Sequence, residues 1–264
     1  MKILFFGDVV GRIGRTAIKQ TLAELKKEVE PDLIIANVEN LAHGVGVTEK
    51  TLQDLVDAGV NFFTSGNHIF DKPEAEMMVT KKDWPLIRPA NYPPGAPGDG
   101  YKIIAVGSRS VLVMNLMGRV FIKENFDCPF RKADEILGQV EVKKLAAIIV
   151  DFHAEATSEK VAMGHYLAGR VSAVLGTHTH VATADQRVLP AGTAYVSDVG
   201  MVGAIDSVIG VEKDSVLKNF LSQMPSAFKI PEEGEVLINS VVIEIDPQNR
   251  QAKSIKRLDK TVQV

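Results

Sequence analysis

The feature that most constrains the fold is a series of short apolar runs that alternate with segments of helical periodicity. Each run ends abruptly at glycine or at polar residues, as strands buried in a parallel sheet do. After the first run, Ile18, Leu22 and Leu25 recur at the spacing of one helix face. This alternation indicates βαβ units and an α/β fold with parallel strand pairing. The expected strands are residues 2–6, 33–36, 60–64, 101–106, 111–115, 146–150, 171–175, 236–245 and 252–258.

The segments between the runs are predicted to form helices and ordered loops. Thr48 suits the N-cap of a helix that runs to Ala58, with Gly59 at its C-terminal end. Proline and glycine between Arg88 and Gly98 exclude a helix or a central strand, so this stretch is expected to be a surface loop beside the site. A hairpin is expected across residues 107–109, and further helices over residues 74–81, 133–140 and 158–168.

The composition fits one domain. The chain has 264 residues, of which 45% are hydrophobic, enough for a substantial core in one large domain or two small ones. The sequence shows no internal repeat, no low-complexity segment and no flexible linker. We therefore expect a single domain over residues 1–264.

Charge and cysteine content exclude several classes of protein. The formal net charge of −3 excludes nucleic-acid binding through a bulk basic surface but leaves room for a local cationic site that holds phosphate. Cys128 is the only cysteine, so no internal disulfide can form and a reducing compartment is expected. The apolar N-terminus is stopped by Gly7-Asp8, too early for a signal peptide, and no run approaches the ~20 apolar residues of a membrane span. A soluble cytoplasmic protein without a membrane partner is expected, and a homo-oligomer is left open.

Residues that bind metals or transfer protons follow several of the apolar runs. The clearest case is Gly176-Thr177-His178-Thr179-His180, in which two histidines follow a buried strand. Neutral imidazole is the commonest protein ligand for metals such as zinc, iron and manganese. In open α/β sheets, the residues just beyond the carboxyl ends of parallel strands share one crevice. The residues at such positions are Asp8, Glu39, Asn40, Asn67, His68, His153, His178 and His180.

The number of these candidate ligands favours two metal ions over one. A single ion takes about three or four protein ligands, whereas two ions can share a bridging carboxylate and keep positions for water. Two divalent ions with Asp8, Glu39 and a hydroxide leave an excess of one positive charge, which attracts an anion. A phosphate diester, which carries one negative charge, fits this balance.

Each residue also has a structural interpretation on its own. Asp8 could cap the following helix, and Glu39 and Asn40 could be solvated turn residues. Asn67 could simply form a turn, and His153 could be a hydrogen-bonded core histidine. Together these interpretations need unrelated coincidences at one sheet edge, so the joint functional interpretation is favoured.

The motifs at the run ends resemble those of a known superfamily when they are taken in chain order. They are Gly7-Asp8, Glu39-Asn40, Gly66-Asn67-His68, His153 and Gly176-Thr177-His178-Thr179-His180. This series resembles the calcineurin-like metallophosphoesterases, and residues 37–40, 66–68 and 88–92 resemble more closely the bacterial YmdB-like branch. The resemblance implies a four-layer α/β/β/α sandwich, a dinuclear metal centre and phosphodiesterase activity, including activity on 2′,3′-cyclic nucleotides.

Position by position, the resemblance implies two sets of metal ligands that share Glu39. The first set is Asp8, Glu39, Asn40 and His180. The second set is Glu39, Asn67, His153 and His178. His68 would stay free of metal and act as the acid that protonates the leaving oxygen.

The sequence departs from the wider superfamily at three points. Val10 stands where the first motif usually has a histidine, and Asn40 could supply the missing ligand. Glu39 replaces the usual bridging aspartate and is one methylene longer. An apolar residue follows His68 where an acidic residue is common, which makes Asp71 a candidate to orient His68.

Two further residues are candidates for substrate contact. His43 lies in a glycine-flanked loop that follows Asn40, so it could touch the substrate. Arg88 could bind phosphate as a planar donor, with a structural salt bridge as the alternative.

The leading hypothesis is a dinuclear phosphodiesterase that cleaves a small phosphodiester or cyclic nucleotide by attack of a metal-bound hydroxide. Its cofactors would be two divalent or mixed-valence ions, with iron or manganese favoured and zinc compatible, because imidazole with carboxylate accommodates all three metals. The alternatives are a phosphomonoesterase or nucleotidase with the same centre, an amidohydrolase, and a regulatory protein whose metal site is structural.

Overall fold

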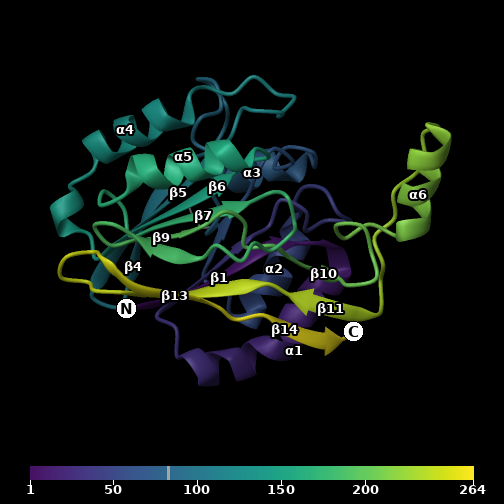
Figure 1. The fold of residues 1–264 in the computed structure, drawn as a ribbon, viewed down its shortest axis with the longest axis horizontal. Helices are drawn as coiled ribbons and strands as arrows, with labels where there is room; N and C mark the ends of the chain where they lie inside the picture. Colours follow the sequence, from purple (N-terminus) through teal and green to yellow (C-terminus); the bar gives the residue numbers. More distant parts are fainter. Residues whose placement is uncertain (82–83) are drawn as a thin grey trace.

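Two β-sheets pack face to face in this protein, and helices cover their outer faces (Figure 1). A computed structural model describes residues 1–81 and 84–264, which form an eight-stranded and a six-stranded sheet. The larger sheet contains β1 (Lys2–Val9), β2 (Leu33–Asn37), β3 (Phe62–Thr64), β10 (Met201–Ala204), β11 (Glu235–Ile238), β12 (Ser240–Ile245), β13 (Ala252–Arg257) and β14 (Lys260–Gln263). The smaller sheet contains β4 (Tyr101–Val106), β5 (Arg109–Met117), β6 (Ala147–His153), β7 (Ala173–Thr177), β8 (Arg187–Leu189) and β9 (Thr193–Val196).

Parallel pairing aligns the strand ends that carry the candidate ligands. In the larger sheet, β1 pairs in parallel with β2 and with β10, and β2 pairs in parallel with β3. In the smaller sheet, β5, β6, β7 and β9 are parallel neighbours, and β4 and β8 are antiparallel at the edges. The predicted α/β organisation with parallel pairing is confirmed.

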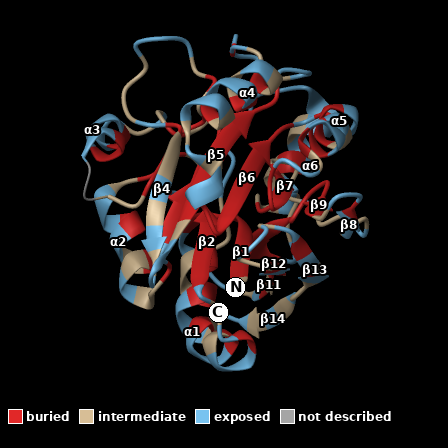
Figure 2. Cartoon of the chain, turned by 90° about the vertical axis from the view of Figure 1, so that its left-hand side faces the viewer, coloured by how far each residue is buried: buried red, intermediate tan, exposed pale blue. Residues whose placement is uncertain are grey.

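Alternate side chains of β1 enter two different apolar layers. Ile3 and Phe5 lie in the layer between the two sheets, whereas Leu4 and Phe6 pack against the helices that cover the larger sheet. Those helices are α1 (Gly11–Val29), α2 (Glu49–Ala58) and α3 (Glu74–Thr80), and α4 (Pro129–Gln139) and α5 (Thr157–Leu167) cover the smaller sheet. Figure 2 shows the strands buried between these helical layers. The predicted four-layer α/β/β/α sandwich is confirmed.

The predicted helix cap and hairpin are confirmed. The hydroxyl of Thr48 accepts a hydrogen bond from the backbone N–H of Thr51 at 3.3 Å, and Gly59 ends α2 with a φ of 97°. Strands β4 and β5 form the expected hairpin, with Val106 paired to Arg109 across a two-residue turn. The sequence signals were local in both cases, so packing elsewhere did not override them.

The predicted strand over residues 236–245 is wrong, because it is broken at Asn239. The Asn239 N–H donates to the carbonyl of Met201 at 3.1 Å, and its side-chain oxygen accepts from the Met201 N–H at 3.2 Å. Its carbonyl accepts from the Gly7 N–H at 3.2 Å. The chain therefore changes partners at this residue: β11 pairs with β10 and β14, and β12 pairs with β1 and β13.

The sequence analysis did not predict β8, β9, β10, β14 or helix α6 (Lys213–Ser222). The four strands are three or four residues long, which is too short to show a period. Helix α6 extends away from the sandwich (Figure 1), and Val216 is its one buried residue. Across the residues that the structure describes, no helix combines the length and the apolar character that crossing a bilayer requires.

Candidate metal centre

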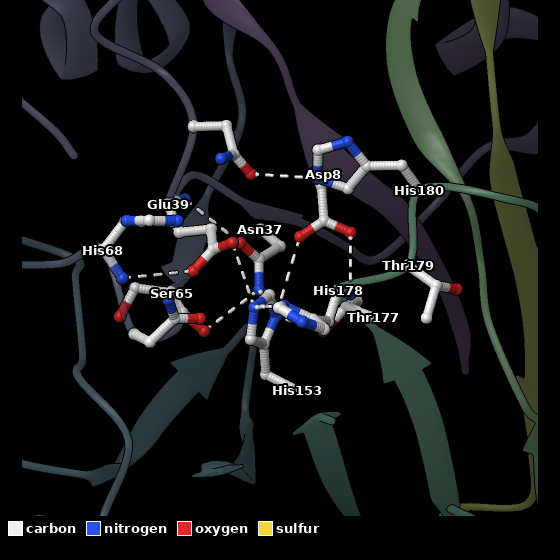
Figure 3. A network of polar contacts seen from close by, with 12 residues as sticks. Asp8, Asn37, Glu39, Ser65, His68, His153, Thr177, His178, Thr179 and His180 are labelled. Atoms are coloured by element: carbon white, nitrogen blue, oxygen red, sulfur yellow. Dashed lines mark hydrogen bonds and ion pairs between the residues drawn. The ribbon is translucent and has the colours of Figure 1, made fainter. Parts of the chain in front are cut away.

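The strand ends of both sheets bring five of the predicted ligands to one site, namely Asp8, Glu39, His153, His178 and His180 (Figure 3). The larger sheet contributes Asp8 near the end of β1 and Glu39 just after β2, and the smaller sheet contributes histidines at the ends of β6 and β7. Potential ligand atoms of Glu39, His153 and His178 lie within 4.8 Å of one another. Asp8, Glu39 and His180 form a second such group. The two groups share Glu39, which is the arrangement expected of a bridging carboxylate.

Two buried oxygen atoms on predicted ligands have no hydrogen-bond partner within the described part of the chain. They are Asp8 Oδ1 and Asn67 Oδ1. Asp8 is completely buried, and its other oxygen accepts from the His178 N–H at 3.1 Å. Because buried polar atoms are nearly always satisfied, these two oxygens fit a bound cation.

Each histidine of the His-x-His motif has one ring nitrogen in an outer polar contact and the other turned inward. His178 Nε2 lies 3.1 Å from Glu155 Oε2, and His180 Nδ1 lies 2.8 Å from the carbonyl of Ile209. The inward Nε2 of His180 lies 3.2 Å from Asn40 Oδ1. When the outer nitrogen carries the proton, the inward nitrogen keeps a free lone pair, as a metal ligand must.

His153 is completely buried at the centre of the site. Its Nδ1 lies 2.8 Å from Thr177 Oγ1. Its Nε2 lies 3.0 Å from Glu39 Oε1 and 3.0 Å from His178 Nδ1. His153 Nε2, His178 Nδ1 and Glu39 Oε1 therefore lie close together, as two imidazole nitrogens and a carboxylate oxygen do when they bind a single cation.

The His-x-His loop is held in a strained backbone conformation by buried contacts. His178 and His180 have φ values of 102° and 63°, in the left-handed region that such residues rarely adopt. Between them, the N–H and hydroxyl of Thr179 donate to Asp198 Oδ2 at 3.1 and 2.7 Å. The same oxygen accepts from the buried Lys160 at 2.6 Å. These contacts fix the direction in which both imidazoles point.

Gly66 lets the ligands approach one another closely. A Cβ at this position would lie 2.1 Å from Glu39 Oε2 and 2.4 Å from His153 Nε2. Any larger residue would therefore displace one of the two ligands. The glycine of Gly66-Asn67-His68 is explained by this packing.

Burial and mutual charge shift the pKa values of the buried ligands. Burial raises the pKa of Asp8 to about 7 and lowers the pKa of His178 to about 3. Burial acts to raise the pKa of Glu39, but the charge and hydrogen bond of His153 together lower it to about 2. Burial acts to lower the pKa of His153, but Glu39 and Asp8 raise it to about 9. A cation bound at His153 Nε2 would compete with the ring proton that this raised pKa favours.

His68 lies beside the ligand groups without belonging to either of those found in the described residues. Its Nδ1 lies 2.7 Å from Asp71 Oδ2, and its side chain is 34% exposed. Its backbone N–H donates to Glu39 Oε2 at 3.3 Å. Asp71 thus occupies the position from which it could orient the His68 ring, as the sequence suggested.

Arg88 and His43 differ in their surroundings. The guanidinium of Arg88 donates to carbonyl oxygens of its own loop, those of Pro89, Ala96 and Pro97, at 2.7, 3.0 and 2.9 Å. These bonds give Arg88 a structural role through carbonyl groups. His43 is exposed, with a φ of 58°. Substrate contact by either residue stays a prediction.

The sequence analysis assigned no role to several polar residues that support the ligands. Asp151 could have been found, because it lies two residues before His153 on the same strand and therefore on the same face as this candidate ligand. Asp198 and Lys160 gave no such signal, because their contact joins α5 to the segment after β9.

Comparisons with known proteins agree with this geometry. The sequence profile of the YmdB-like protein family matches residues 4–258. The chain belongs to this family. Its fold is shared with solved structures that include nucleotidases.

The YmdB-like chain aligns with named proteins over nearly its whole length. A 2′,3′-cyclic-nucleotide 2′-phosphodiesterase from Bacillus subtilis (strain 168) is 46% identical over 259 residues, which cover 98% of this chain and 96% of the relative. The crystal structure of a phosphatase from Mycoplasma pneumoniae is 34% identical with a TM-score of 0.91, covering 99% and 93% of the two chains. The NAD nucleotidase of Haemophilus influenzae, at 12% identity, shares the fold with a TM-score of 0.59 over 100% of this chain and 56% of its own.

Proposed function

We propose that this YmdB-like protein is a metal-dependent hydrolase of phosphate diesters, with 2′,3′-cyclic nucleotides among its substrates. The observation that carries the proposal is the pair of ligand groups that share the buried Glu39. Two cations held in this way match the centres that bind a phosphoryl group between two metals. The Bacillus subtilis relative supports the cyclic nucleotide as the substrate class.

The proposed ligand roles follow from the two groups and the unpaired oxygens. Glu39 is assigned to both metals, and its position between the groups supports the bridging role. The unpaired oxygens of Asp8 and Asn67 support one further ligand on each side. The first metal is assigned to Asp8, Glu39, Asn40 and His180, and the second to Glu39, Asn67, His153 and His178.

The protein itself supplies orientation and exclusion of water. When bound, the metal pair lowers the pKa of water and withdraws charge from the phosphate oxygens. Asp8, Glu39 and His153 are at most 1% exposed, so water is kept from the inner side of the site and electrostatic interactions there are strong. The ion pair of His178 with Glu155 and the hydrogen bond of His180 with the Ile209 carbonyl hold both rings before substrate arrives.

His68 is proposed to protonate the leaving oxygen. Asp71 accepts from Nδ1 of the ring, which leaves Nε2 to carry the transferable proton. The partial exposure of His68 allows substrate to reach it. The release of a ribose alkoxide needs this proton, since that group is a very poor leaving group as an anion.

The remaining parts of the proposal concern the identity of the metal, the cellular compartment, the domain organisation and the oligomeric state. We propose iron or manganese as the metal, with zinc compatible, because the imidazole and carboxylate set accepts all three. The single Cys128 supports a reducing compartment such as the cytoplasm. The single-domain organisation and a homo-oligomeric state stay predictions.

The test combines metal analysis with turnover. Chelator-treated protein is reconstituted with Mn²⁺ or Fe²⁺ and assayed on 2′,3′-cyclic AMP, bis-p-nitrophenyl phosphate and p-nitrophenyl phosphate. We expect two equivalents of metal per chain and faster cleavage of the diesters than of the monoester. Saturation at one equivalent would refute the shared centre. Faster monoester turnover would favour a phosphomonoesterase, and two bound metals without turnover would favour a regulatory protein.

A further inference from the structure

A buried carboxylate adjoins the site without belonging to either ligand group of the described residues. Asp151 lies on β6, two residues before His153, and is completely buried. Its Oδ1 accepts from Thr177 Oγ1 at 2.6 Å. Its Oδ2 accepts from Asn37 Nδ2 at 2.9 Å and from Thr64 Oγ1 at 2.5 Å. Asp151 thus joins β2 and β3 of the larger sheet to β6 and β7 of the smaller one.

The hydroxyl of Thr177 connects this carboxylate to the ring of His153. A threonine hydroxyl has one proton, and here that proton is donated to Asp151. Thr177 Oγ1 can therefore only accept from His153 Nδ1, which lies 2.8 Å away. In its neutral form the His153 ring then carries its one proton on Nδ1, which leaves Nε2 free to bind a metal where Glu39 and His178 converge. The hydrogen-bond chain sets the tautomer that a metal ligand requires.

Other neighbours of His153 Nδ1 do not replace Thr177 as its acceptor. Asn37 Nδ2 is 3.5 Å away, but its two protons are donated to the carbonyl of Ser65 at 3.0 Å and to Asp151 at 2.9 Å. Asp8 Oδ1 lies 3.6 Å from Nδ1, beyond hydrogen-bond distance. Thr177 is the nearest acceptor.

A second arm leads from Asp151 to Glu39. The side chain of Asn37 donates to Asp151 from its nitrogen, and its oxygen accepts from the Glu39 N–H at 3.1 Å. Asn37 is completely buried, so these bonds fix which way its amide faces. Asp151 therefore reaches two ligands of the same group, His153 through Thr177 and Glu39 through Asn37.

We propose that Asp151 is a positioning residue that sets the tautomer of His153 and the place of Glu39 through these two arms. It thereby governs how tightly the metal of the Glu39, His153 and His178 group is held. The inference rests on the proposed metal-dependent function. It predicts an asymmetric defect, in which loss of the carboxylate weakens one of the two metals more than the other.

Four variants separate this role from simple packing. Thr177→Val keeps the side-chain shape but removes the hydroxyl, and Asp151→Asn gives Thr177 a donor in place of an acceptor. Thr177→Ser retains the hydroxyl and serves as the matched control. Thr64→Val removes a hydrogen bond to Asp151 without a contact to the His153 ring, so it reports the purely structural contribution.

Zinc binding to chelator-treated protein is measured by competition with a chromogenic chelator and by elemental analysis. We expect Thr177→Val and Asp151→Asn to lose about 10–100-fold in affinity for one of two zinc ions. Thr177→Ser and Thr64→Val should bind both ions as the wild type does. Equal zinc affinity in Thr177→Val and Thr177→Ser would overturn the proposal.

The tautomer is read directly by NMR of zinc-loaded protein with ¹⁵N-labelled histidine. The ring signals of His153 are identified by their loss in His153→Gln. We expect two-bond couplings to show a proton on Nδ1 and a metal-bound Nε2 in the wild type. A proton on Nε2, or metal on Nδ1, overturns the proposal whether or not the variants fold, and circular dichroism reports which variants do.

The outcomes also distinguish this inference from the proposed function. If the wild type holds fewer than two zinc ions at saturation, the dinuclear centre and the role of Asp151 both fall. If the wild type binds two ions and cleaves the diester while Thr177→Val does so equally well, the role of Asp151 alone is overturned.

Discussion

Replacing Gly66 with alanine would place a methyl group between two of the proposed metal ligands. The new Cβ would lie 2.1 Å from Glu39 Oε2 and 2.4 Å from His153 Nε2, whereas ordinary contact begins at 3.4 Å. One or both ligands must therefore move by about 1 Å to relieve the overlap. A displacement of about 1 Å near the reacting groups costs on the order of 10²-fold in rate. We expect diester turnover to fall by about two orders of magnitude.

The assay follows three quantities in Gly66→Ala. Hydrolysis of bis-p-nitrophenyl phosphate reports turnover, elemental analysis reports metal content, and thermal unfolding reports stability. Overpacking of this kind costs about 1–3 kcal/mol, so the chain should still fold. The matched control is Gly138→Ala in α4, because a Cβ there meets no atom within 4 Å. That variant should keep full activity and gain up to about 1 kcal/mol of stability.

Retention of both metals and near wild-type turnover in Gly66→Ala would refute the reasoning. It would mean that Glu39 and His153 have room to shift without loss of function. If Gly66→Ala and Gly138→Ala had equal activity, the same conclusion would follow, because the Gly138→Ala control moves neither Glu39 nor His153.

Glu39→Gln keeps the shape of the shared ligand but removes its charge. Metal content should therefore fall below two equivalents and diester turnover should collapse, while the circular dichroism spectrum is unchanged. Near-normal turnover would place the bridge elsewhere. His68→Ala should keep both metals, lose about 10²–10⁴-fold on 2′,3′-cyclic AMP and lose much less on bis-p-nitrophenyl phosphate, whose leaving group needs no proton. Asp71→Asn should show the same pattern more weakly, and equal losses on both substrates would contradict proton donation. Burial raises the pKa of Asp8 to about 7, and the neighbouring carboxylates outweigh burial and raise the pKa of His153 to about 9, so the metal-free folded chain holds protons that the unfolded chain releases. Below about pH 6.5 the contribution of Asp8 is offset by His178, because burial lowers the pKa of His178 to about 3. The free energy of unfolding of chelator-treated protein should therefore fall as pH rises from about 6.5 to about 9, by up to about 1.4 kcal/mol per pH unit for each group within its range. Urea titrations across this range check it, and stability that rises with pH would contradict it.

The convergence of the candidate ligands could be predicted because each follows an apolar run. Parallel pairing places the carboxyl ends of neighbouring strands at one edge, so the position of His153 after its run was enough to locate it. The convergence of two sheets could not be derived from periodicity. It came from the family resemblance, and the structure confirms it through Ile3 and Phe5, which face the second sheet.

The support of the ligands could not be predicted from local patterns. The ion pair of Lys160 with Asp198 depends on a helix and a loop that meet only in the folded chain. Asn239 reads as part of a strand, yet its two hydrogen bonds with Met201 divide that strand. Arg88 shows the same limit, since a planar donor in a loop has the same sequence signal whether it holds phosphate or carbonyl groups.

The division of ligands between the two sheets has a consequence for synthesis of the chain. A nascent chain carries Asp8 and Glu39 long before His153 and His180 have been added. Oxygen ligands alone suit ions such as magnesium and calcium, whereas iron and zinc bind firmly once imidazole joins them. Strand β1, which carries Asp8, also pairs with β12, one of the last strands to leave the ribosome. A half-made chain therefore lacks every histidine of the proposed ligand set, so a transition metal held as proposed could be captured only after β7 and the His-x-His loop have been made.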